Sequence, residues 1–485
     1  MSADPMSTPG KRNAALAAGL FCCLLAGLGN QAHALDFPDA LKDPLLAVPP
    51  KLDEGVRLPR DDKPLTCPSS VDLSAPLSLS DVVDLTLCRD PQIQAAWADI
   101  KIQASSVGEA RSAYLPTVTG ATTQLHNRVR YPGSSQPAST TQGQTVYAGL
   151  GWRLFDFGGR AANLDAANRQ LTAALLSHDA ALQKALTTAV GAYFDVLTAQ
   201  AQTQTGEEAV RLAEQTVAVT TRRFARGAAA QSDTLQADAA LAKAQLAAQR
   251  ALGEQKKALS VLVYTMNLPS GTPLLLAAAA QAPTAESIQG LSYWLTQAQA
   301  QHPEILAARA QWEASKAKVT AARSEGLPTI DFTANHYRNG YPNQGLQTTR
   351  SNTTTWGIAL NIPIFEGFSR TYKIRGAQAQ AEQNEARLAD VERRTLLEVV
   401  KAHADAVSAQ ENLSSSTKLL DAARAAVESS ERRYAKGAAD ILELLQQQNA
   451  LAEARRERIR CLSEWRSARL RLMASTGVLD SLSLQ

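Results

Sequence analysis

Arg222-Arg223-Phe224-Ala225-Arg226-Gly227 is matched 210 residues later by Arg432-Arg433-Tyr434-Ala435-Lys436-Gly437. In both stretches cations fill what would be the last turn of a helix, where the helix dipole favours positive charge. The glycine that follows can take the left-handed conformation that ends a helix, at no steric cost. Acidic residues, Asp233 in the first copy and Asp440 with Glu443 in the second, then restart the helical pattern. Each stretch is therefore predicted to be the tip of a helical hairpin, and the chain contains this hairpin twice.

The duplication extends well beyond the tips. At the same offset of 210, Leu-Phe-Asp-Phe-Gly-Gly-Arg at 154–160 corresponds to Ile-Phe-Glu-Gly-Phe-Ser-Arg at 364–370. Upstream the offset is 212, and Leu-Pro-Thr-Val at 115–118 corresponds to Leu-Pro-Thr-Ile at 327–330. A loop insertion explains the change of offset. The period is far too long for a solenoid unit, so the sequence indicates a tandem duplication of a domain.

Composition restricts the class of protein. The 485 residues carry a formal net charge of +3, which is too small to indicate binding to nucleic acid. Hydrophobic residues make up 45% but aromatic residues only 5%, which is typical of long helices packed at close range. The six histidines are scattered, and there is no phosphate-binding glycine loop or nucleophile elbow. We therefore expect no enzymatic activity, no metal and no cofactor.

Residues 1–34 have the organisation of a secretory signal peptide. Lys11-Arg12 precedes an apolar run from Ala14 to Gly29, and Ala32-His33-Ala34 supplies a small-x-small cleavage site. No later apolar run reaches about 18 residues, so we expect an exported chain that could enter a membrane only as strands.

A proline-rich N-terminal arm is predicted over residues 35–78. In an oxidising compartment Cys67 and Cys88 are expected to pair across a short loop, with unpaired thiols as the alternative. Cys461 falls on a predicted helix and is expected to be a small buried residue.

The pattern changes to a period of two in each repeat. The first structural repeat, residues 79–268, contains a predicted β-hairpin at 117–155, and the second, residues 291–485, contains one at 329–365. One face of each return strand is apolar: Val146, Ala148, Leu150, Trp152 and Leu154 in the first, and Trp356, Ile358, Leu360, Ile362 and Ile364 in the second. Such strands, of about 9–11 residues, are typical of an outer-membrane barrel. A soluble hairpin half buried on a core is the alternative.

Long helices follow each hairpin. Proline-free helical patterns run from Phe155 to Arg226 and from Ser369 to Lys436. About 65–70 residues at 1.5 Å each span roughly 100 Å. Return helices are predicted from Gln231 to Met266 and from Asp440 to Ser475, and residues 269–290 form a linker between the repeats.

Four strands cannot close a barrel, and an open edge in hydrocarbon leaves backbone groups unpaired at several kcal/mol each. Two copies of the chain would supply eight strands and three copies twelve. The chain is therefore predicted to self-associate.

These features together resemble the TolC family of outer-membrane exit ducts. The resemblance rests on the doubled plan, on Phe-Asp-Phe-Gly-Gly-Arg at 155–160 and on the Arg-Phe/Tyr-x-x-Gly tips, and it covers about residues 79–478. It implies a mainly α fold with transmembrane β, in which each chain supplies four β-strands and long coiled-coil helical hairpins. The implied homotrimer has a 12-stranded β-barrel in the outer-membrane lipid of a Gram-negative cell, set on an α-helical barrel that extends into the periplasm.

The resemblance also implies a function. It is that of a passive channel-tunnel in a tripartite export system, docking on a periplasmic adaptor (membrane fusion) protein and an inner-membrane transporter of ABC or RND type. Type I secretion of proteins, including toxins, is the expected task, and a multidrug or small-molecule efflux duct is the alternative. A periplasmic coiled-coil adaptor and a structural envelope protein are two further interpretations.

By the same resemblance, the tips hold the functional residues. Asp233 and Tyr434 correspond to a hydrogen-bonding pair that closes the periplasmic mouth. Glu443 corresponds to a first pore-facing acid, which in three copies would favour cations, and Gln446 to the position of a second acid. The expected adaptor-docking residues are Arg226, Gly227, Lys436 and Gly437.

Two observations leave this assignment open. The family often has an arginine where this chain has Ala439, so part of the closing contact is missing. From spacing alone, Asp440 with Glu443 resembles a capping box, and Asp233 favours a helix N-terminus.

Overall fold

The computed structural model describes residues 43–55, 67, 75–277, 288–339 and 351–477. The chain divides into Met1–Leu46 and Ala47–Gln485, and the second unit contains every helix and strand of the described residues. The predicted signal peptide and most of the predicted arm lie outside these residues, as do residues 340–350 of the second predicted hairpin. Among the helices described, none combines the length and the apolar character needed to cross a membrane.

The same series of elements occurs twice. After a short helix α2 (Lys51–Glu54), the first series is α3 (Leu79–Arg89), α4 (Pro91–Ser112), β1 (Thr117–Val129), β2 (Ser139–Phe155), α5 (Gly159–Ala225) and α6 (Gln231–Thr265). The second series is α7 (Leu291–Gln301), α8 (Pro303–Ser324), β3 (Thr329–Asn339), β4 (Ser351–Asn361), α9 (Ser369–Ala435) and α10 (Ile441–Ser475). Matching helices have identical lengths of 11, 22, 67 and 35 residues. The repeat is therefore one of whole structural units.

Capping residues set where the shorter helices begin. Ser78 and Asp81 form a capping box at the start of α3. The Asp90 carboxylate accepts hydrogen bonds from two backbone N–H groups at the start of α4, and the equivalent His302 ring accepts one at the start of α8. A proline follows both Asp90 and His302, at the first helical position, where its missing N–H costs nothing.

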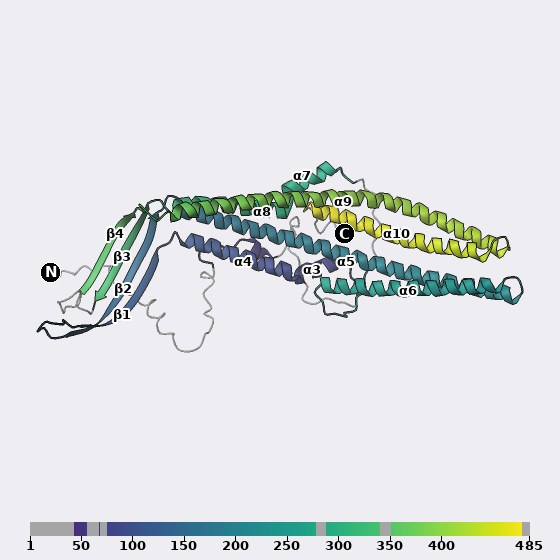
Figure 1. Cartoon of the computed structure of the whole chain (residues 1–485), viewed down its shortest axis with the longest axis horizontal. Coiled ribbons are helices and arrows are strands. Elements are labelled where there is room, and N and C mark those ends of the chain that lie inside the picture. Colours follow the sequence, from purple (N-terminus) through teal and green to yellow (C-terminus); the bar gives the residue numbers. More distant parts are fainter. Residues whose placement is uncertain (1–42, 56–66, 68–74, 278–287, 340–350, 478–485) are drawn as a thin grey trace, which may run out of the picture. The chain divides into compact units, whose positions relative to one another are not determined.

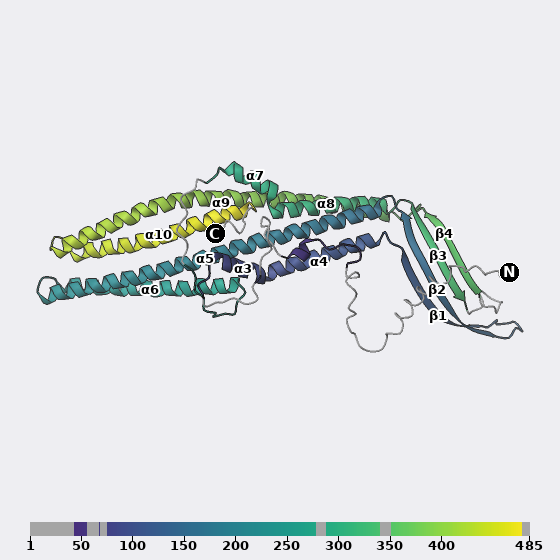
Figure 2. The same cartoon turned by 180° about the vertical axis from the view of Figure 1, so that it is seen from behind.

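The two 67-residue helices, α5 and α9, are the longest elements. At 1.5 Å per residue each spans roughly 100 Å. Helix α5 packs against α4, α6, α8 and α10, and α9 packs against α7, α8 and α10 (Figures 1 and 2). The main core joins α3 to α5 and α6 through fully buried side chains such as Val82, Leu186 and Leu262. The backbone of Leu77 bridges Leu276, so the segment before α3 is paired with the inter-repeat segment.

The four strands form one antiparallel sheet in the order β1-β2-β3-β4. The central pairing, with Leu150 opposite Ala334, joins the two repeats. Strands β3 and β4 have 11 residues, but β1 and β2 have 13 and 17, so the predicted length of about 9–11 was wrong for the first hairpin. Pairing there continues past the apolar stretch into polar residues, with Gln144 opposite Gln124 and Thr140 opposite Arg128.

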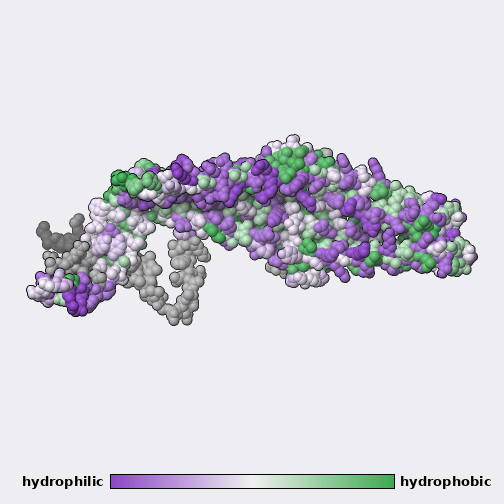
Figure 3. Space-filling view, viewed as in Figure 1, coloured by the Kyte–Doolittle hydropathy of each residue, from purple (hydrophilic) through white to green (hydrophobic). Residues whose placement is uncertain are grey.

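The apolar face of β4 is exposed in the single chain. Trp356, Ile358 and Leu360 have exposed fractions of 77%, 69% and 60%, and Ile364 beyond the strand reaches 94%. On the face that Figure 3 shows, apolar surface gathers where the strands meet the long helices and around α7, and smaller apolar patches lie among polar surface toward the tips.

An arginine holds each junction between the sheet and a long helix. Arg160 donates to the carbonyl oxygens of Arg153 (2.7 Å) and Leu154 (3.2 Å), and its Nε lies 3.1 Å from the Asp156 carboxylate. In the second repeat Arg370 donates to the carbonyl oxygens of Arg323 and Gly326, at 3.0 and 2.9 Å. The repeated Phe-Asp/Glu…Arg element therefore fixes how the strands leave the helices.

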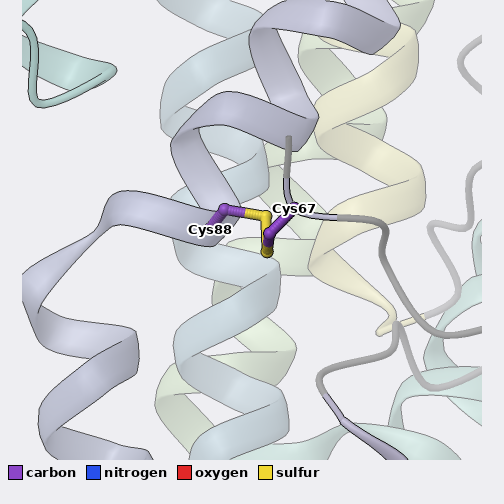
Figure 4. The surroundings of a disulfide bond; sticks show 2 residues. All are labelled: Cys67 and Cys88. Atoms are coloured by element: carbon purple, nitrogen blue, oxygen red, sulfur yellow. A yellow bond between two sulfur atoms is a disulfide. The ribbon is translucent and has the colours of Figure 1, made fainter. Parts of the chain in front are cut away.

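Cys67 and Cys88 form a disulfide bond, with their Cα atoms 5.6 Å apart (Figure 4). Cys88 lies on α3, one helix of the main core. Cys461 is buried and free, as the sequence predicted.

Candidate functional site: the two hairpin tips

Both hairpins turn with the same backbone geometry. Gly227 and Gly437 have φ values of 70° and 72°, the left-handed conformation that favours glycine. The N–H of Ala228 donates to the carbonyl of Arg223 at 2.9 Å, and the N–H of Ala438 donates to that of Arg433 at 2.8 Å. These bonds satisfy carbonyls at the helix ends, as in a Schellman motif. Figures 1 and 2 show both tips at the end of the molecule opposite the sheet.

The return helices start differently in the two hairpins. In α10 the Asp440 carboxylate accepts a hydrogen bond of 2.7 Å from the N–H of Glu443, so the capping interpretation of Asp440 is confirmed. The Glu443 side chain does not complete a capping box, because it pairs with Arg433 at 2.6 Å. In α6 no side chain caps the start, and Asp233 lies in the first turn, where the helix dipole favours an acid.

Tyr434 is the buried aromatic residue of the second tip. Its exposed fraction is 5%, and it packs with Ile441, Leu444 and Leu445 of its own hairpin, against Ala240 of the first hairpin. Its hydroxyl has no hydrogen-bond partner among the described residues. The predicted hydrogen bond between Asp233 and Tyr434 is therefore not formed in the single chain.

Arg223 makes the contact between the tips. Its guanidinium stacks over the Tyr434 ring, 4.5 Å from the centroid, and its Nη1 donates to the Tyr434 carbonyl oxygen at 2.6 Å. That carbonyl also accepts the N–H of Gly437 and stands at the negative end of α9, which favours a cation. Sequence reasoning missed this role, although the offset of 210 pairs Arg223 with Arg433 and so marked it as part of the tip.

The charge of Asp233 acts on the Tyr434 hydroxyl. Burial raises the pKa of the Tyr434 hydroxyl; the Arg223 charge opposes this rise and the Asp233 charge adds to it. Asp233 is thus within electrostatic range of Tyr434. Gln446 is exposed on α10, outside this cluster.

Further polar contacts continue from the tips along one stripe of α5. We call this contact region between the hairpins the seam. Thr216 and Gln448 are joined by a side-chain hydrogen bond of 3.1 Å, and Glu208 pairs with Arg455 at 2.9 Å. A small cavity of about 50 Å³, lined by Leu212, Leu445 and other residues, lies in the seam. The polar contacts of the seam therefore add to apolar packing between the hairpins, such as that of Tyr434 against Ala240.

The expected docking residues lie at the outermost turns. Arg226, Gly227, Lys436 and Gly437 are all exposed. In the part of the chain that the structure describes, no group of three His, Cys, Asp or Glu side chains could hold a metal ion. The tips can accordingly offer cations and backbone groups to a partner protein.

Comparison with known proteins agrees with the fold. A family model described as outer membrane efflux protein matches residues 82–267 and 294–478, one segment in each repeat. The chain is 34% identical over 469 residues to Protein CyaE of Bordetella pertussis, covering 97% of this chain and 96% of the relative. It is 26% identical over 429 residues to the alkaline protease secretion protein AprF of Pseudomonas aeruginosa, covering 84% and 86%.

Solved structures share the fold at low identity. The outer membrane protein VceC of Vibrio cholerae matches with a TM-score of 0.72 at 19% identity, covering 82% of this chain and 96% of that chain. The outer-membrane channel OprN matches with a TM-score of 0.73 at 20% identity, covering 87% and 97%. The predicted duplicated, TolC-like fold is thereby confirmed. The chain belongs to the outer membrane efflux protein family.

Proposed function

We propose that three copies of this chain form a passive channel through the outer membrane, and that the channel exports proteins delivered by an inner-membrane pump. The observation that carries the proposal is the sheet. Strands β1 and β4 each pair on one side only within the described sheet, and β4 exposes a row of large apolar side chains. Neighbouring copies would satisfy both edges, and lipid would cover the apolar face.

The dimensions support this arrangement. The 11 residues of β4 span roughly 37 Å at 3.4 Å per residue, or about 26 Å when tilted by about 45°. That height fits a hydrocarbon core about 30 Å thick. Helices roughly 100 Å long then carry the duct far beyond the membrane, toward a pump on the other side of the periplasm.

Protein export is favoured over small-molecule efflux by the relatives. AprF is named for the secretion of alkaline protease, and PrtF of Dickeya chrysanthemi, 22% identical over 415 residues, for the secretion of proteases. Efflux is the second candidate, because BepC of Brucella suis, 26% identical over 397 residues, is named an outer membrane efflux protein. We therefore propose type I secretion, with an ABC-type transporter rather than an RND pump as the inner-membrane component.

The tips complete the proposal. We propose that the cluster around Tyr434 and Asp233 closes the periplasmic mouth, and that Glu443 and Gln446 face the lumen beside it. Arg226, Gly227, Lys436 and Gly437 would then meet the adaptor, since they are the outermost exposed residues of the hairpins.

The channel is tested by conductance in planar bilayers and by the mass of the purified protein in detergent. We expect trimers with discrete conductance steps. Ile358→Arg places a charge on the apolar face and should reduce assembly strongly, because a mid-membrane arginine costs about 2–4 kcal/mol. Thr355→Arg, on the opposite face of the same strand, is the matched control and should assemble. A water-soluble monomer without conductance would refute the proposal.

The pump is tested by crosslinking in cells. Photoreactive groups at Arg226→Cys and Lys436→Cys should capture an adaptor encoded with an ABC transporter. Capture of an adaptor that works with an RND pump would instead assign the duct to small-molecule efflux.

A further inference from the structure

The two repeats differ in what their equivalent arginines do. Arg223 and Arg433 occupy the same place in the duplication, 210 residues apart. Arg433 stays within its own hairpin, donating to Glu443 at 2.6 Å and to the Ala438 carbonyl oxygen at 3.3 Å. Arg223 crosses to the other hairpin and binds Tyr434. Two equivalent arginines in the duplicated hairpin thus take two different positions.

The first hairpin also contains an acid at the place equivalent to the one that binds Arg433. Asp233 is the residue that the offset pairs with Glu443, so it stands ten residues after Arg223 across the same turn. The turns that separate each arginine from its acid share two backbone hydrogen bonds, from the glycine N–H to the carbonyl of the aromatic residue and from the following alanine N–H to the carbonyl of the arginine. The glycine φ values differ by only 2°. The arrangement of Arg433 with Glu443 is therefore open to Arg223 with Asp233, although aspartate is shorter by one methylene.

We propose that Arg223 is a movable latch, which clamps the second tip through Tyr434 and folds back onto Asp233 when the hairpins separate. The inference rests on the proposed function, because it assigns a residue to the opening of the proposed mouth. A latch of this kind lowers the cost of opening, since the arginine leaves one partner for another instead of being left without an acceptor. It also needs no hydrogen bond from the Tyr434 hydroxyl, which has no partner among the residues that the structure describes.

The first test measures the distance between the tips, independently of any channel activity. Nitroxide labels at Ala225→Cys and Ala435→Cys, the exposed last residues of α5 and α9, report the separation of the hairpins by pulsed electron resonance. Arg223→Ala should raise the population of separated tips about tenfold, which corresponds to about 1.4 kcal/mol. Arg222→Ala is the matched control, because the side chain of this neighbouring arginine donates to the Ala218 carbonyl of its own helix and does not cross to the second hairpin within the described part of the chain. Equal distance distributions in the two variants would overturn the latch.

The second test separates the ring from the hydroxyl. Tyr434→Phe keeps both the ring face and the backbone carbonyl that Arg223 uses, so the tip distances should stay those of the unmodified chain. Tyr434→Leu removes the ring and should separate the tips, as Arg223→Ala does. A result in which Tyr434→Phe opens the tips as far as Tyr434→Leu would assign the closure to the hydroxyl and overturn the latch.

The third test addresses the return to Asp233. Asp233→Asn removes the second acceptor and should lower the separated population about threefold, as expected for a solvent-exposed ion pair. In the Arg223→Ala background the same change should have no effect. A rise with Asp233→Asn, or an equal effect in both backgrounds, would contradict the exchange. Conductance of the same variants distinguishes failure of the proposed function from failure of the latch. If the unmodified protein carries no current, the proposed channel is refuted. If it carries normal current but the tip distances do not respond to the substitutions, only the latch is refuted.

Discussion

The Thr216–Gln448 contact in the seam allows a sharp test, because deleting one partner should favour opening whereas deleting both should be close to neutral. Thr216 is buried, with an exposed fraction of 6%, and its hydroxyl meets the Gln448 amide at 3.1 Å. Thr216→Val keeps the shape but leaves the amide facing a methyl group while the hairpins are closed. A part-buried polar group left without its partner costs about 1 kcal/mol, and separation of the hairpins relieves that cost by admitting water. Opening should therefore become about five times more frequent.

The double variant Thr216→Val with Gln448→Leu replaces both polar groups by apolar ones. Such a replacement is close to neutral, so the frequency of opening should return toward that of the unmodified channel. Single-channel recordings in planar bilayers measure both variants. As a control, Arg455→Gln removes the partner of Glu208, but those side chains are 32% and 49% exposed, so less than about a twofold change is expected. Equal opening frequencies of the single and the double variant would show that the unpaired Gln448 amide does not drive the hairpins apart.

Three further predictions concern stability and reactivity. Burial lowers the pKa of His302, whose neutral ring caps α8, so the stability that this cap contributes is present above the ordinary histidine pKa and is lost as pH falls toward the lowered value. His302→Asp, which copies Asp90, should abolish that loss in thermal melts between about pH 7 and pH 5, and an unchanged pH profile would contradict it. Replacing Cys67 and Cys88 by serine should destabilise the chain by about 3 kcal/mol from the entropy of the 21-residue loop, and a reductant should then have no further effect on the melting temperature. Burial raises the pKa of Cys461, so maleimide should label it only after unfolding, and rapid labelling of the folded protein at neutral pH would show that the site is open.

The elements that could be predicted from sequence are those set by local pattern. A proline-free run of 67 residues with a helical pattern predicts a long helix, and a glycine after clustered cations marks its end. The family and the fold followed from the doubled pattern and are confirmed. The disulfide could be predicted because Cys67 and Cys88 are close in sequence, whereas Cys461 is distant from both.

What sequence could not supply depends on contacts between the repeats. Arg222, Arg223 and Arg226 are equivalent as cations near a helix end, and nothing local indicates which one crosses to the second hairpin. The partner of Arg223 is 211 residues away. The strand lengths of the first hairpin were wrong for a related reason, since β1 and β2 support each other through polar residues that carry no apolar alternation.

The difference between the tips has a consequence for opening. Phe224 and Tyr434 are equivalent in the duplication, yet Phe224 has an exposed fraction of 45% and Tyr434 one of 5%. Within one chain, the first hairpin therefore covers the second tip, while its own aromatic residue stays available to something outside the chain. In the proposed trimer the three copies of Phe224 have equivalent surroundings, so each can pack on the neighbouring subunit in the same way. Contacts within a subunit and contacts between subunits would then use different residues, Tyr434 for the first and Phe224 for the second. A Phe224→Ala variant should accordingly weaken the trimer at the tips while the labels on Ala225→Cys and Ala435→Cys keep their distance, and a change in that distance would show that the two sets of contacts are not separate.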